Sequence, residues 1–240
     1  MPENQAADSI SQEDYDTYTA NWLTLVNDPD PTALPKAFQI PEVSRINFLN
    51  FTLDQVTALV APDVVTIKAR FLAIADGANV LRFSTALFGL DADNKRLTDY
   101  YVPLPPQAGG PTTEPASSGT GPNPHISRKD ALEWLTAWVD ANALTASLFS
   151  TPNGPLRGYN FGVGTLKDPL AAAQPTDGKG LFLNLGLHHD PTSPQIPQTL
   201  DLVLYINMLG SRTQGTLAGA PDDESYYNGG HGCPPQLMMS

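Results

Sequence analysis

The chain has little of three things: cysteine, basic side chains and long apolar runs. Its single cysteine among 240 residues, Cys233, excludes an intrachain disulfide and favours a reducing compartment. The 13 lysines and arginines stand against 25 acidic residues, which gives a formal net charge of −12. This charge would repel a phosphate backbone or an anionic membrane, so we expect no nucleic acid and no membrane partner.

Two targeting signals are also missing from the sequence. No apolar run approaches the roughly 20 residues that a membrane helix needs. Residues 1–11 are polar and acidic, without the basic and apolar parts of a secretory signal. Together with the cysteine content, these features predict a cytoplasmic protein.

What is present is typical of a folded protein with long, structured loops. The hydrophobic fraction is 41%, and 23 prolines and 19 glycines punctuate the chain. Ser11 and Thr52 have the capping spacing that begins helices, and residues 64–75 alternate between apolar and polar side chains as a half-buried strand does. The first half predicts helices and strands in this order: helix 11–27, loop 28–41, strand 45–51, helix 52–60, strands 64–75, 80–90 and 97–102.

The second half repeats that order after a segment rich in Pro, Gly, Ser and Thr. A helix is predicted from Ser127, followed by strand 159–163, a helical turn at 165–173 and two alternating strands at 181–188 and 200–208. The composition of residues 105–124 is that of a linker. We therefore divide the chain into a first α+β repeat, residues 1–104, a linker, 105–124, and a second repeat with a C-terminal tail, 125–240.

Short matches between the halves favour a tandem duplication. Trp22-Leu23-Thr24 recurs as Trp134-Leu135-Thr136, Asn47-Phe48 with Thr52-Leu53 recurs as Asn160-Phe161 with Thr165-Leu166, and Tyr100-Tyr101 recurs as Tyr226-Tyr227. The matches lie in the same order in both halves, which is the argument for duplication. The predicted fold is α+β, with a helix–strand–helix–β-hairpin unit present twice and helices packed on one face of antiparallel sheet or sheets. The hairpins could share one sheet or stand in separate lobes.

Three short motifs of the second half resemble those of other proteins. The run Thr199-Leu200-Asp201-Leu202-Val203-Leu204, the pair Tyr226-Tyr227 and the tail Cys233-Pro234-Pro235 resemble a group of uncharacterised bacterial proteins. These motifs are short, and the group brings no activity with it. The resemblance therefore implies a tail of this type and no function.

One cluster of side chains has the chemistry of a metal site. Imidazole, carboxylate and thiolate are ligands for zinc or iron, and the chain offers His188, His189, Asp190, His231 and Cys233. Adjacent residues of a strand face opposite ways, however, and no helical His-Glu-x-x-His spacing occurs. The alternative is that His188 and His189 stand at a solvated strand end, and this alternative is favoured. No cofactor is expected.

The paired tyrosines are the candidate binding residues. Because neighbours on a strand point to opposite faces, one ring of Tyr100-Tyr101 and one ring of Tyr226-Tyr227 are expected at the surface. Tyrosine favours protein interfaces. The leading hypothesis is a non-enzymatic protein-binding or assembly protein, acting on a protein partner or on itself. The alternative is a metal-dependent hydrolase or lyase that uses the His/Asp/Cys cluster.

Overall fold

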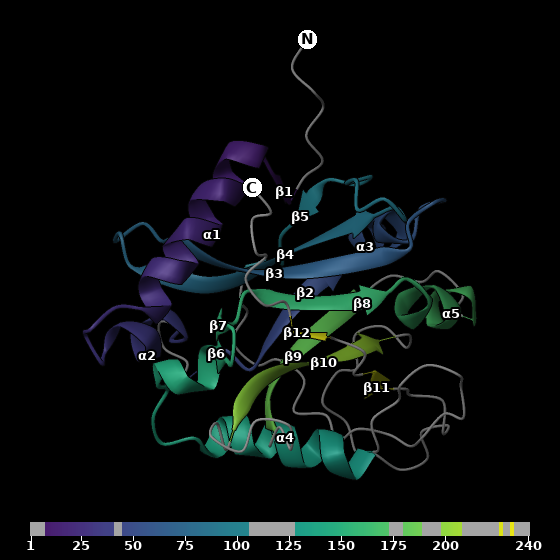
Figure 1. The fold of residues 1–240 in the computed structure, drawn as a ribbon. Helices are drawn as coiled ribbons and strands as arrows, with labels where there is room; N and C mark the ends of the chain where they lie inside the picture. Colours follow the sequence, from purple (N-terminus) through teal and green to yellow (C-terminus); the bar gives the residue numbers. More distant parts are fainter. Residues whose placement is uncertain are drawn as a thin grey trace.

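The two long β-hairpins of the chain lie in different sheets, and each sheet also contains a strand from the other half of the sequence (Figure 1). This arrangement is that of a computed structural model. It describes residues 8–40, 45–105, 128–172, 180–188, 198–207, 226–227 and 231–232. The predicted linker, 105–124, lies outside the described residues apart from Pro105.

The larger sheet has six strands in the order β1-β5-β4-β3-β8-β12. Its hairpin of β3 and β4 pairs along its whole length, from Thr66 opposite Leu90 to Ala75 opposite Leu81. The strands are β1 (Ser9–Ile10), β3 (Thr66–Ala75), β4 (Leu81–Leu90), β5 (Tyr100–Tyr101), β8 (Gly158–Gly162) and β12 (His231–Gly232).

The smaller sheet has four strands in the order β11-β10-β9-β2, and a two-stranded β6-β7 ladder lies apart from both sheets. All pairings in the three sheets are antiparallel. The strands are β2 (Phe48–Thr52), β9 (Gly180–His188), β10 (Thr199–Asn207), β11 (Tyr226–Tyr227), β6 (Ser150–Thr151) and β7 (Gly154–Pro155).

The helices cover the outer faces and the ends of the two sheets (Figure 1). The first long helix packs on β3 and β4 of the six-stranded sheet, and the second packs on β9 of the four-stranded sheet. The described helices are α1 (Gln12–Val26), α2 (Ala33–Ala37), α3 (Leu53–Leu59), α4 (Arg128–Asp140), the 3₁₀ turn η1 (Ala146–Phe149) and α5 (Gly164–Ala172). The α+β class, with antiparallel sheets and a helix on one face of each, is therefore confirmed.

Local sequence signals explain where several elements begin. The Ser11 hydroxyl accepts from the Asp14 backbone N–H, and Thr52 and Gln55 form a reciprocal capping box at the start of α3. The expectation of an uninterrupted loop at 28–41 is wrong, because α2 forms there. Its Pro35 lies in the first turn, where the missing backbone N–H would have no partner within the helix.

The two predicted repeats share one core. β2, from the first half, pairs with β9 in the four-stranded sheet, and β8, from the second half, pairs with β3 in the six-stranded sheet. The inner faces of both sheets contribute to a single hydrophobic cluster that contains Ile67, Leu183 and Trp22. The strands are thus exchanged between the halves, and the hairpins form two packed layers.

The halves match in register at several points. Leu87 lies opposite Tyr101 where β4 meets β5, and Leu204 lies opposite Tyr227 where β10 meets β11. The Phe71 N–H donates to the Arg157 carbonyl just before β8, as the Leu185 N–H donates to the Asn47 carbonyl just before β2. The paired tyrosines therefore occupy equivalent positions. Duplication of an ancestral unit itself stays a prediction.

One anchor of the predicted duplication is wrong. Trp22 matches Trp138 and not Trp134, because both Trp22 and Trp138 are buried in the central cluster and donate an indole N–H across the halves. The Trp22 indole reaches the Leu156 carbonyl at 2.8 Å, and the Trp138 indole reaches the Ile46 carbonyl at 3.0 Å. Trp134, one turn earlier on the same face of α4, is half-buried and packs in the separate cluster of Ala131 and Val203.

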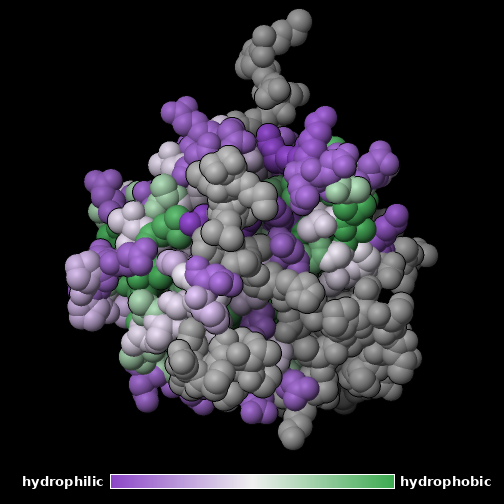
Figure 2. Space-filling model, in the orientation of Figure 1, coloured by the Kyte–Doolittle hydropathy of each residue, from purple (hydrophilic) through white to green (hydrophobic). Residues whose placement is uncertain are grey.

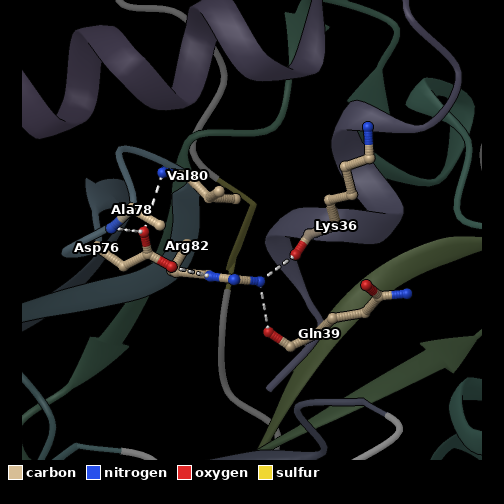
Figure 3. Close-up of polar contacts among 6 residues, drawn as sticks. All are labelled: Lys36, Gln39, Asp76, Ala78, Val80 and Arg82. Atoms are coloured by element: carbon tan, nitrogen blue, oxygen red, sulfur yellow. Dashed lines mark hydrogen bonds and ion pairs between the residues drawn. The ribbon is translucent and has the colours of Figure 1, made fainter. Parts of the chain in front are cut away.

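An arginine joins the first hairpin to α2 (Figure 3). The Arg82 guanidinium donates to the Asp76 carboxylate at 2.8 Å and to the backbone carbonyls of Lys36 and Gln39 at 2.7 and 2.8 Å. Asp76 in turn accepts from the backbone N–H groups of Ala78 and Val80 in the hairpin turn. The Asp76 carboxylate thus orders the hairpin turn. Arg82 links this turn to the C-terminal end of α2, where it donates to two backbone carbonyls.

Candidate functional site

The outer layer formed by α4 on the four-stranded sheet contains the candidate site. Ala131 of α4 and Val203 of β10 are buried against each other, with Trp134, Leu135 and Phe182 packed around them. A side chain at Gly186 would place its Cβ only 3.0 Å from the Trp134 Cβ. The glycine therefore allows the helix to approach the sheet closely at Trp134.

His188 and Asp201 form an ion pair on this covered face. The His188 Nδ1 lies 3.0 Å from Asp201 Oδ2, and their side chains are 23% and 4% exposed. The other Asp201 oxygen, Oδ1, accepts from the Leu202 backbone N–H at 2.7 Å. The Trp134 ring lies over His188, with centroids 4.7 Å apart. A buried, oriented carboxylate beside Nδ1 fixes the orientation of the imidazole.

The first half has no equivalent of this pair. Leu72 lies opposite Ser84 in the six-stranded sheet as Gly186 lies opposite Asp201 in the four-stranded sheet. Serine thus stands at the position of Asp201, and Ile74 stands at the position of His188. Sequence reasoning missed Asp201. The available signal was a carboxylate within the apolar run of β10, on the face that Val203 shares.

Of the predicted metal set, the structure describes only His188 and the backbone of His231, and it places them in different sheets. His188 pairs with Asp201, whereas the backbone of His231 lies in β12, which pairs with β8 in the other sheet. His189, Asp190 and Cys233 lie outside the described residues. Within the part of the chain that the structure describes, no group of three or more His, Cys, Asp or Glu residues could hold a metal ion.

The predicted exposure of one ring of Tyr100-Tyr101 is wrong, since both residues are buried, at 5% and 8% exposure. Their rings do face opposite ways, but each face is covered. Tyr100 stacks on Tyr15 of α1 at 4.0 Å and donates its hydroxyl to Gln12 Oε1, whereas Tyr101 joins the central cluster. For Tyr226 and Tyr227, only the backbone of β11, paired with β10, is described.

Two apolar side chains of α4 are exposed at the edge of its contact with the sheet. Leu132 and Val139 are 36% and 57% exposed, and Leu135 between them is half-buried. The spacing i, i+3, i+7 places the three side chains on one stripe of the helix. We call Leu132, Leu135 and Val139 the α4 stripe.

The matching stripe on α1 is more polar. The α4 stripe lies six and three residues before Trp138 and one residue after it. The residues at the same offsets from Trp22 on α1 are Asp16, Thr19 and Leu23, and only Leu23 is apolar. Leu23 is half-buried against the central cluster. Figure 2 shows hydrophilic residues along the upper edge of the molecule, where α1 begins. The apolar outer stripe is therefore a property of α4.

Comparison with family models, with curated proteins and with solved structures gives no significant match. The resemblance of the C-terminal motifs to uncharacterised bacterial proteins stays an expectation. Among the described helices, none is long and apolar enough to cross a membrane.

Proposed function

We propose that the protein is a non-enzymatic binding and assembly protein that associates with a second copy of itself through the α4 stripe. The observation that carries the proposal is the exposure of Leu132 and Val139, at 36% and 57%, on a helix at the outside of the molecule. Burying such a stripe against an identical one removes apolar surface from water on both copies.

Charge favours an antiparallel pair of α4 helices as the contact. The helix begins with Arg128, Lys129 and Asp130, which together carry a net charge of +1, and ends with Asp140. A twofold axis at the middle of the stripe brings the basic end of each helix to the acidic end of its partner, and a twofold contact is self-complementary. In a chain of net charge −12, such a pairing limits the repulsion between copies.

The expected association is weak. With 13 residues, α4 is about 20 Å long, so the stripe alone buries less area than a standard stable interface. We therefore expect a dissociation constant in the micromolar range, on the order of 10 µM. The proposal includes a cytoplasmic location, in keeping with the single cysteine, and no nucleic-acid partner, in keeping with the acidic charge.

Sedimentation equilibrium at protein concentrations from about 1 to about 100 µM tests the proposal, because this range brackets the expected constant. The wild type should pass from monomer to dimer, and Val139→Glu, at an exposed position, should stay monomeric. Ala20→Glu on the exposed side of α1 is the matched control and should dimerise as the wild type does.

Two outcomes contradict self-association through α4: a wild type that is monomeric throughout, or a Val139→Glu variant that dimerises normally. Circular dichroism of each variant shows whether it is folded. Elemental analysis of the purified protein tests the alternative function, a metal-dependent enzyme. A stoichiometric metal that is lost on His188→Ala would support the metal-dependent hydrolase or lyase in place of the assembly protein.

A further inference from the structure

Arg70 is a basic side chain whose hydrogen-bonding capacity is only partly used, since its guanidinium donates to the Tyr15 hydroxyl. It lies on the outer face of β3, half-buried, and its Nη1 is buried with no hydrogen-bond partner. None of the ion pairs between described residues includes Arg70. A buried guanidinium nitrogen without an acceptor costs free energy, so its retention calls for an explanation.

Two other arginines of the chain have hydrogen-bond acceptors for their guanidinium groups. Arg45 donates to the carbonyls of Trp138 and Ala141 at 2.6 and 2.7 Å, and Arg82 donates to Asp76 and to two carbonyls. Both side chains have acceptors on more than one nitrogen. Arg70 differs, and an oxyanion is the acceptor that a planar guanidinium fits best.

The surroundings of Arg70 offer further donors. Its guanidinium lies beside the Tyr15 hydroxyl of α1 and partly offsets the effect of burial, which raises the pKa of Tyr15 to about 12. The tyrosine thus keeps its proton at neutral pH and can donate it in a hydrogen bond. Lys68, two residues from Arg70 on the same face of β3, adds a second positive charge.

The neighbouring strand leaves space at the Thr66 end of this face, whereas a Cβ on Gly158, opposite Arg70, would collide with the Ala69 carbonyl oxygen. Across from β3 on β8, Gly158 lies opposite Arg70, Asn160 opposite Lys68 and Gly162 opposite Thr66. A Cβ placed on Gly162 would have no atom within 4 Å. The strand therefore presents one polar side chain between two glycines on this face.

The equivalent face of the four-stranded sheet is filled. Phe48, the first residue of β2, takes the position of Gly158, and Phe182, the third residue of β9, takes the position of Lys68. The two phenylalanine rings contact each other with centroids 5.7 Å apart. Asn184, at the position of Arg70, donates to the Val203 carbonyl. One face is thus closed by aromatic rings, and the other has two cations and open space at Gly162.

We propose that the outer face of β3 and β8 binds an oxyanion, a carboxylate or a phosphate group, through the Arg70 guanidinium, with the Tyr15 hydroxyl as a second donor. Lys68 contributes long-range attraction. This site lies on the six-stranded sheet and is separate from the α4 stripe, so binding there does not depend on self-association.

Thermal unfolding with added inorganic phosphate or acetate tests the site, against sodium chloride at matched ionic strength. The wild-type Tm should rise with the logarithm of the anion concentration once this exceeds the dissociation constant, whereas Arg70→Gln should respond to each anion as it does to chloride. Arg96→Gln removes an equal charge at an exposed position of the same half and should respond as the wild type does. Tyr15→Phe should lower the apparent affinity about fivefold.

The two anions separate the possible ligands. A response to phosphate alone assigns a phosphate group, and a response to acetate assigns a carboxylate. Equal responses of the wild type and Arg70→Gln, or a wild type that responds no more than it does to chloride, would overturn the proposal. The Nε–H signal of Arg70 in the wild-type NMR spectrum gives a readout that does not depend on any variant folding: it should shift on addition of the anion that raises the Tm, and a signal that stays in place counts against the site.

Discussion

Trp138 donates its indole N–H to the backbone carbonyl of Ile46, 92 residues earlier in the chain. Ile46 lies just before β2, the strand that the first half contributes to the four-stranded sheet. The Arg45 guanidinium lies over the same indole, 5.5 Å from its centre, and donates to the Trp138 carbonyl. The helix of one half therefore holds the exchanged strand of the other.

Trp138→Phe should destabilise the protein by about 3 kcal/mol, since it leaves the Ile46 carbonyl without its donor and removes buried volume. Urea unfolding followed by circular dichroism measures the loss. Trp134→Phe, at a half-buried position on the same helix, is the matched control and should cost about 1 kcal/mol or less. Equal losses for both variants would contradict the role assigned to Trp138.

Thr85→Val should stabilise the protein by about 1 kcal/mol. Thr85 is fully buried in β4, and its hydroxyl has no hydrogen-bond partner, so valine removes an unsatisfied polar group. Thr52→Val should have the opposite effect, about 1 kcal/mol of destabilisation, because the Thr52 hydroxyl caps α3. Chemical denaturation of the two variants compares the signs, and a destabilised Thr85→Val would show that the hydroxyl is needed.

The Asp76 carboxylate makes the stability of the folded protein depend on pH. Hydrogen bonds from the Val80 backbone and from Arg82 hold the pKa of Asp76 below its ordinary value of 3.8. A depressed folded-state pKa gives a contribution that is complete above pH 3.8 and is lost as the pH falls through the folded-state value. The Tm of the wild type should therefore exceed that of Asp76→Asn at neutral pH, and the difference should shrink in acid. A difference that is independent of pH would contradict the assignment.

Local patterns in the sequence predicted the secondary structure well where one side chain decides the outcome. The capping spacing of Thr52 and Gln55 and the alternation of β3 each depend on neighbours within a few residues, and both are confirmed. Trp134 and Trp138 are one helical turn apart, so the sequence alone could not tell which of them enters the core. That choice depends on where Ile46 lies in the fold.

The candidate site depended on contacts between distant segments. The partner of His188 is Asp201, which becomes its neighbour only when β9 and β10 pair. One ring of Tyr100-Tyr101 was expected at the surface because alternation leaves one ring outside, but α1 covers the face of Tyr100 and stacks Tyr15 on it. Alternation separates the two faces of a strand; it does not show which elements pack on either of them.

The exchange of β2 and β8 has a consequence for how the polypeptide can be divided. A fragment that ends before α4 would keep the hairpin of β3 and β4 but lose β8, the strand that closes one side of it, and its own β2 would have no sheet to join. Each half thus supplies a strand to a sheet that the other half also builds. The two halves therefore contact each other as the subunits of a heterodimer do. Because they belong to one chain, they are always present in a ratio of one to one.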